Sequence, residues 1–140
     1  MDCVLLGDRH RELSEGVRGL LATMFAGVFT VADETSLLEG AARIQPTVIV
    51  VDLSLAGGDI VGFVRALRRQ APAVKVLLLT AHDETTVASA ALAAGVDGVV
   101  FTRAIATDLL EAVEAVLAGR RYVSSAAAHR RPRGGVESEC

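Results

Sequence analysis

Five short apolar runs alternate along the chain with segments whose apolar residues recur every three or four positions. The run at residues 48–51 is continuous and β-branched throughout, which is typical of a strand buried on both faces of a sheet. The other expected strands cover residues 3–6, 28–32, 74–79 and 98–101. Strands that alternate with helices predict a parallel sheet with helices on both faces. Right-handed crossovers then give a doubly wound α/β fold.

Polar and glycine residues predict where several helices begin and end. Asp33 is expected to cap a helix that reaches Ile44, and Thr107 is expected to cap the last helix. Gly95 is well placed to end a helix in a left-handed conformation, and Gly119 closes the last helix.

The composition is that of one globular domain. Of the 140 residues, 51% are hydrophobic and 22% are charged, a balance that excludes a disordered chain. The longest apolar stretches are far short of the ~20 residues that a membrane span needs, and no secretory signal is visible. We therefore expect a cytoplasmic protein with no membrane partner.

The cysteines and histidines are not arranged as a metal site. Cys3 is interpreted as a small core residue and Cys140 as a free thiol on a tail. His10, His82 and His129 do not form a metal set, and the loop residue His82 is interpreted as a surface histidine.

Charge is divided unevenly along the chain. Residues 1–119 carry 9 basic and 15 acidic residues, whereas residues 120–140 carry 5 arginines and 2 glutamates. The acidic body discourages nucleic acid. The basic tail is either a solvated, disordered end or a segment that binds phosphate backbones, and Pro132 with Gly134 and Gly135 favours disorder.

Three polar side chains follow expected strands at the edge where such sheets bind ligands. Asp8, Asp52 and Thr80 each lie at the carboxyl end of a strand, and we expect them to converge on one shallow site. A carboxylate at such a position can attack phosphorus and form an acyl phosphate, and a second carboxylate nearby can hold Mg²⁺. A single strand-end aspartate would more simply cap the following helix, but the three residues together favour phosphoryl chemistry.

Several motifs give the chain a resemblance to a known family, the receiver domains of two-component response regulators, and more narrowly to the NarL-type subgroup. The motifs lie at residues 4–10 (VLLGDRH), 15–21 (EGVRGLL), 48–59 (VIVVDLSLAGGD), 78–81 (LLTA) and 94–98 (AGVDG). The resemblance implies a receiver domain over residues 1–123, with strand order 2-1-3-4-5. Residues 124–140 are then interpreted as a basic, disordered tail.

The same resemblance assigns roles to individual residues. It implies that Asp52 is the phosphoacceptor, that Asp8 belongs to the Mg²⁺ pocket with the backbone carbonyl of Ser54, and that Thr80 is the switch hydroxyl. It also implies a signalling switch and not an enzyme, with a histidine kinase or another signalling protein as partner. Members of this family often form homodimers.

Four positions depart from the family pattern. Arg9 stands where a second acidic residue is usual, Thr102 replaces a lysine, Val99 replaces an aromatic switch residue, and Ala56 replaces a proline. A guanidinium near the pocket opposes Mg²⁺ binding, and we expect Arg9 to pair instead with one of the two carboxylates. Thr102 cannot neutralise a phosphoryl oxygen. Phe101, on the same strand face as Val99, is a candidate substitute for the missing aromatic residue.

These departures leave two functions open. The first is an atypical receiver that works as a protein-interaction module with impaired or absent metal-dependent phosphorylation. The alternative is a working phosphoreceiver that a histidine kinase phosphorylates on Asp52. A flavin-binding relative of the same fold is disfavoured, because Asp8 would repel the flavin phosphate.

The chain is too short after its last helix for a DNA-binding helix bundle. DNA binding is therefore not expected from this chain alone, which is interpreted as a stand-alone receiver or as a fragment of a longer regulator.

Overall fold

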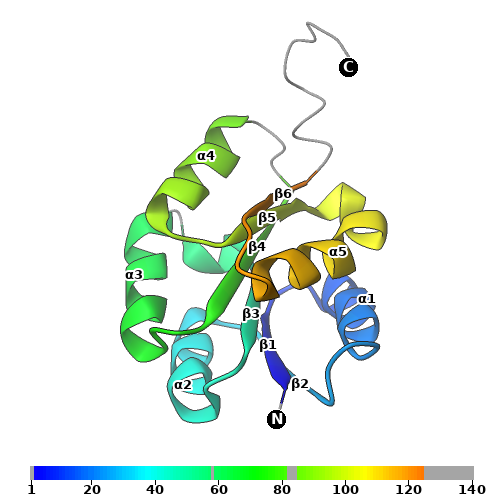
Figure 1. Ribbon diagram of the computed structural model, residues 1–140. Coiled ribbons are helices and arrows are strands. Elements are labelled where there is room, and N and C mark those ends of the chain that lie inside the picture. The colour runs from blue at the N-terminus through cyan, green and yellow to red at the C-terminus, as the bar shows by residue number, and fades with distance from the viewer. Residues whose placement is uncertain (1, 58, 82–84, 125–140) are drawn as a thin grey trace, which may run out of the picture.

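All strands of the described structure lie in one parallel sheet, in the order β2-β1-β3-β4-β5-β6 (Figure 1). The computed structural model describes residues 2–57, 59–81 and 85–124. The strands are β1 (Cys3–Gly7), β2 (Gly27–Val31), β3 (Val48–Asp52), β4 (Lys75–Thr80), β5 (Gly98–Phe101) and β6 (Tyr122–Val123). The expected doubly wound α/β fold with strand order 2-1-3-4-5 is therefore confirmed, with one further strand at its edge.

Helices cover both faces of the sheet, as expected (Figure 1). They are α1 (Arg11–Leu21), α2 (Glu34–Ile44), α3 (Ile60–Gln70), α4 (Thr85–Ala94) and α5 (Ile105–Leu117), with short 3-10 turns η1 (Leu53–Ala56) and η2 (Thr102–Ala104). Buried side chains of α2, α3 and α4 pack against one face of the sheet. Those of α1 and α5 pack against the other face. Successive side chains of the central strands enter opposite layers, which explains why residues 48–51 are apolar without interruption.

The sixth strand, β6, was not expected. Its two residues pair with β5 in the registers Gly98↔Tyr122 and Val99↔Val123. The close approach depends on Gly98, where a Cβ atom would lie 2.7 Å from Leu77 Cδ1 and 3.2 Å from the Tyr122 carbonyl oxygen. A strand this short has no periodic pattern, so its formation depends on tertiary pairing that sequence reasoning does not reach.

Ser124 follows β6 and is fully buried. Its backbone N–H donates to the Val99 carbonyl at 2.8 Å, and its hydroxyl donates to Asp108 on α5. These bonds attach the end of the described chain to the sheet and to a helix. The remainder of the basic tail, with Cys140 and His129, lies outside the described residues, as does His82.

The helix ends follow the predicted signals in three of four places. Asp33 accepts the Ser36 backbone N–H at 2.7 Å, and Gly95 and Gly119 have φ values of 113° and 85°. The prediction that Thr107 caps the last helix was wrong. The turn η2 continues directly into α5, which begins at Ile105, and the Thr107 hydroxyl donates to the carbonyl oxygen of Ala104 instead.

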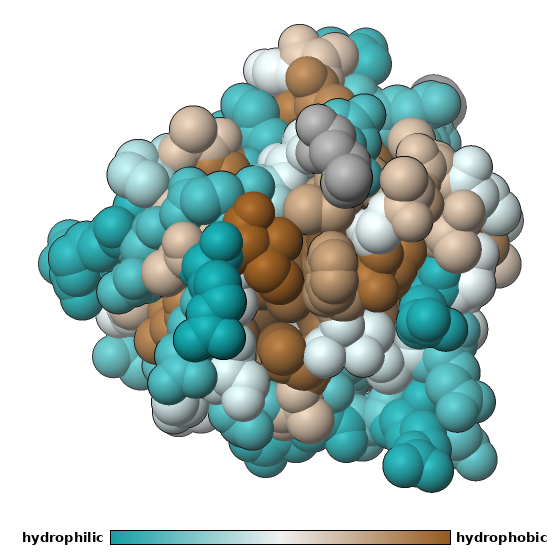
Figure 2. Space-filling model, turned by 90° about the horizontal axis from the view of Figure 1, so that it is seen from below, coloured by the Kyte–Doolittle hydropathy of each residue, from teal (hydrophilic) through white to brown (hydrophobic). Residues whose placement is uncertain are grey.

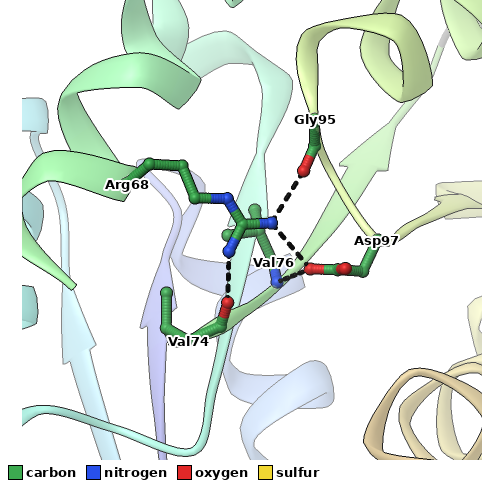
Figure 3. A network of polar contacts seen from close by, with 5 residues as sticks. All are labelled: Arg68, Val74, Val76, Gly95 and Asp97. Atoms are coloured by element: carbon green, nitrogen blue, oxygen red, sulfur yellow. Dashed lines mark hydrogen bonds and ion pairs between the residues drawn. The ribbon is translucent and has the colours of Figure 1, made fainter. Parts of the chain in front are cut away.

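A network of polar contacts joins α3 to the segments that precede β4 and β5 (Figure 3). The Arg68 guanidinium donates to the carbonyl oxygens of Val74 and Gly95 and to the Asp97 carboxylate. Asp97 also accepts the backbone N–H of Val76. Arg68 therefore satisfies one backbone carbonyl just before β4 and another just after α4 with one side chain.

Hydrophobic residues also gather on part of the surface. Seen from the side where the N-terminus lies, they occupy the middle of the face, with hydrophilic residues around them (Figure 2). The candidate site lies at the opposite, carboxyl ends of the strands. In the described ranges no helix is both long enough and apolar enough to cross a membrane.

Candidate functional site

A cavity of about 390 Å³ opens at the carboxyl ends of β3, β4 and β5. Asp52 is the last residue of β3 and is 6% exposed, and Thr80 is the last residue of β4 and is fully buried. The cavity is lined by His10, Leu13, Asp52, Leu53, Ser54, Thr80, Ala81 and Thr102. The structure thus brings the predicted phosphoacceptor and the predicted switch hydroxyl to one cavity.

Asp52 is held by the turn that follows it. Its Oδ2 accepts hydrogen bonds from the backbone N–H of Ser54, at 3.0 Å, and from the Ser54 hydroxyl. Asp52 is also the N-terminal residue that caps η1. Because both of these bonds fall on Oδ2, Oδ1 is the oxygen better placed to act as a nucleophile.

Asp8 lies directly after β1 and is almost completely buried. Its Oδ1 accepts the His10 backbone N–H at 2.9 Å, and the imidazole Nδ1 of His10 lies 3.4 Å from the same oxygen. Its Oδ2 is buried and has no hydrogen-bond partner within the described residues. Burial raises the pKa of the Asp8 carboxyl above its usual value, and the Asp52 carboxylate nearby raises it further.

These groups fit a bound cation. One ligand atom from each of Asp8, His10 and Asp52 lies within 4.8 Å of the others. A buried carboxylate oxygen without a partner costs free energy that a cation would offset. Mg²⁺ is commonly held by one or two carboxylates together with phosphate oxygens, and Asp8 and Asp52 supply that pair.

His10 joins the two aspartates in this cluster, although sequence reasoning assigned it no metal-binding role. Its side chain is 63% exposed, yet it lines the Asp52 cavity and lies against Asp8. The signal was its position two residues after Asp8, because a carboxylate readily accepts the backbone N–H two positions further on. His10 is the basic side chain that the described structure places beside both carboxylates.

The expected pairing of Arg9 with a carboxylate is not what the structure shows. Within the described residues Arg9 makes no ion pair with Asp8 or Asp52. Its exposed side chain lines a different cavity, together with Arg11 and Arg18 of α1. Arg9 follows β1 in an exposed bend, where its guanidinium stays in contact with water.

The other departing positions are placed as follows. Thr102 is half-buried at the wall of the Asp52 cavity, where the family has a lysine. Val99 is fully buried. Phe101, which is the strand partner of Thr80, packs in the same core layer as Val99. Ala56 is buried in η1. Among its described lining residues, the cavity around Asp52 therefore has no lysine or arginine.

Comparison with known proteins agrees with this fold. A family model described as the response regulator receiver domain matches residues 4–114. The chain belongs to the receiver domains of two-component response regulators.

Individual relatives are of the same kind. The transcriptional regulatory protein RcsB of Escherichia coli K12 is 26% identical over 126 residues, which is 85% of this chain and 57% of RcsB. The transcriptional regulatory protein DegU of Brevibacillus brevis is 30% identical over 128 residues, 90% of this chain and 54% of DegU. The chain thus spans a little over half the length of these relatives.

A solved structure of closely similar extent is also known. It is a LuxR-family two-component response regulator from Aurantimonas sp. SI85-9A1, with a TM-score of 0.83 and 29% identity. The match covers 96% of this chain and 98% of that one.

Proposed function

We propose that this receiver domain works mainly as a protein-interaction module of two-component signalling, in which metal-dependent phosphorylation of Asp52 is impaired. The observation that carries the proposal is the charge of the Asp52 cavity. Thr102 lines it in place of a lysine, and Arg9 lines another cavity. The described lining includes no lysine or arginine.

Phosphoryl transfer places added negative charge beside two carboxylates, Asp8 and Asp52. Such a step needs positive groups that stabilise the developing charge. A bound divalent cation would supply part of that stabilisation, held by Asp8 and Asp52. The hydroxyl of Thr102 supplies no charge, and His10 is largely solvated, so the phosphorylated state is stabilised less than it would be beside a lysine.

The alternative, a working phosphoreceiver, has an observation of its own in its favour. Among the described residues Asp8 Oδ2 is buried without a partner, and this is the arrangement expected where a cation binds. Asp52 and Thr80 also line one cavity, so the nucleophile and the hydroxyl that would bind a phosphoryl oxygen are both in reach. This function uses the same residues and differs in how much phosphorylated protein accumulates.

The partners proposed for this chain are signalling proteins: a histidine kinase, another regulator, or a second copy of the chain. The proposed role is that of a non-enzymatic component in the cytoplasm. The names of RcsB and DegU describe transcriptional regulators, and each is nearly twice the length matched here. DNA binding is therefore not proposed for this chain by itself.

The test is the mass of the intact protein after incubation with acetyl phosphate, with and without Mg²⁺. We expect a small phosphorylated fraction in the native chain and none in Asp52→Ala. The double variant Arg9→Asp with Thr102→Lys restores the family's charges, and its phosphorylated fraction should rise several-fold. Complete, Mg²⁺-dependent phosphorylation of the native chain would instead establish the working phosphoreceiver.

A further inference from the structure

A second and larger cavity lies beside the Asp52 site, between α1 and the end of β2. Its volume is about 650 Å³, within the range of roughly 300–1,000 Å³ found for small-molecule sites. Three arginines line it: Arg9, Arg11 and Arg18. The function proposed above makes no use of them.

The sequence explains why these arginines meet. Arg11 and Arg18 are seven positions apart on α1, which places them on the same face of the helix, two turns from each other. Arg9 precedes the helix and reaches the same hollow. Thr30, at the end of β2, closes the opposite side.

The positive charge of this cavity is not neutralised by ion pairs. The ion pairs His10–Asp8 and Arg68–Asp97 involve none of these arginines, and no ion pair of Arg9, Arg11 or Arg18 exists among the described residues. The two acidic side chains of the cavity are Glu15, between Arg11 and Arg18 on the helix, and Asp8, whose side chain is fully buried. Three guanidinium groups therefore face one exposed carboxylate.

The end of α1 adds to this field. The helix begins at Arg11, and its first turn has no side-chain cap from His10. The N–H groups of a helix N-terminus attract anions, and Arg11, the first residue of α1, lines this cavity; the acidic Glu12 of the same turn offsets part of that attraction.

We infer that this cavity binds a small molecule with two linked phosphate groups, held by Arg9, Arg11 and Arg18. One guanidinium group can donate two parallel hydrogen bonds to phosphate oxygens. Two linked phosphates offer enough oxygens for more than one arginine. The acidic charge of residues 1–119 disfavours a nucleic acid as the occupant. The cavity is an open hollow of about 650 Å³, a size that suits a small molecule.

The inference is independent of the function proposed for Asp52. Arg9 stands where the family has an acidic residue, and this exchange removes a negative charge from the Asp52 site. The same exchange adds a positive charge to the neighbouring cavity, which the side chain of Arg9 lines.

Isothermal titration calorimetry of the full chain with inorganic pyrophosphate, without divalent cations and at low salt, tests the inference. Binding should weaken by about tenfold in each of Arg9→Ser, Arg11→Ser and Arg18→Ser, since each loses a charged hydrogen-bonding partner. Arg65→Ser is the matched control, because Arg65 is an exposed arginine of α3 away from this cavity. It should bind pyrophosphate like the native chain. Glu15→Gln removes the exposed carboxylate and should strengthen binding.

Other outcomes overturn the inference. Stronger pyrophosphate binding in Asp52→Ala, together with unchanged binding in the three arginine variants, would place the anion in the Asp52 cavity instead. Equal weakening in Arg65→Ser would show attraction by surface charge alone, and failure of the native chain to bind would dismiss the site. Arginine-dependent binding of a short DNA duplex that pyrophosphate does not displace would identify a nucleic-acid surface. Melting curves monitored by circular dichroism confirm that every variant is folded.

Discussion

The guanidinium of Arg68, on α3, lies 2.9 Å from the carboxylate of Asp97, the residue directly before β5. The two side chains are 30% and 26% exposed. Because Arg68 also binds two carbonyl oxygens, its removal leaves backbone acceptors as well as a carboxylate without that partner.

Arg68→Met should therefore destabilise the domain by about 2 kcal/mol, the typical cost of leaving polar groups unsatisfied. Denaturation by urea measures the change in the free energy of unfolding. The neighbouring Arg69 is exposed and forms no ion pair within the described residues, so Arg69→Met is the control and should change stability little. Equal losses in both variants would contradict the role assigned to the Arg68 network.

Asp8 is expected to lower stability at neutral pH in the absence of a cation. Burial raises its pKa, so the folded chain holds the proton more strongly than the unfolded chain does. The stability that it contributes is present below the unfolded pKa and is lost as pH rises through the folded pKa. At pH 7 the charged carboxylate is therefore unfavourable.

Asp8→Asn removes this charge and should raise Tm at pH 7, with each kcal/mol corresponding to roughly 2–8 °C. The gain should disappear in acid, where the native Asp8 is itself protonated. Thermal melts from pH 3 to pH 8 in the presence of a chelator measure both effects. The exposed Asp2 gives the control variant Asp2→Asn, whose Tm should follow that of the native chain.

The bond between Ser124 and Asp108 is expected to hold β6 in place. Both residues are buried, and the Ser124 hydroxyl donates to Asp108 Oδ2. Ser124→Ala removes this donor and should cost about 1–3 kcal/mol of the free energy of unfolding. Ser89→Ala, at an exposed position of α4, should cost little. Hydrogen exchange at the backbone amide of Ser124 should accelerate in Ser124→Ala, and an unchanged rate would show that β6 does not depend on the bond.

Tyr122 should make the domain sensitive to alkali. Burial, followed by the charges of Asp108 and Glu111, raises its pKa to about 12. The unfolded chain loses the phenolic proton near its usual pKa of about 10, so stability should fall as pH rises from about 10 to 12. Tyr122→Phe should largely remove this fall, because Tyr122 is the single tyrosine of the sequence. The measurement is urea denaturation at pH 9, 10 and 11.

Much of the fold could be predicted because its signals are local. The apolar run at residues 48–51, the cap at Asp33 and the positive φ of Gly95 each depend on a few neighbouring residues. The parallel order of strands then places Asp52 and Thr80 at one edge without further information. The features that were not predicted depend on contacts between residues distant in sequence, or on the direction of one side chain.

The strand β6 and the side chain of Arg9 are two such features. β6 forms because Gly98 leaves room for it, a relation between residues more than twenty positions apart. Arg9 was expected to face the carboxylates because of its charge, but the bend after β1 and the hollow beside α1 decide where its side chain lies. Opposite charges close in sequence therefore did not predict an ion pair.

The strand β6 also determines where the sheet remains open to other chains. It occupies the free edge of β5, where the N–H groups of Tyr122 and Ser124 bind the carbonyl oxygens of Asp97 and Val99. In the described part of the chain, the long unpaired edge is then that of β2, which exposes 47% of Phe29. Strand addition by another polypeptide, whether in assembly or in aggregation, is directed to the β2 side of the molecule.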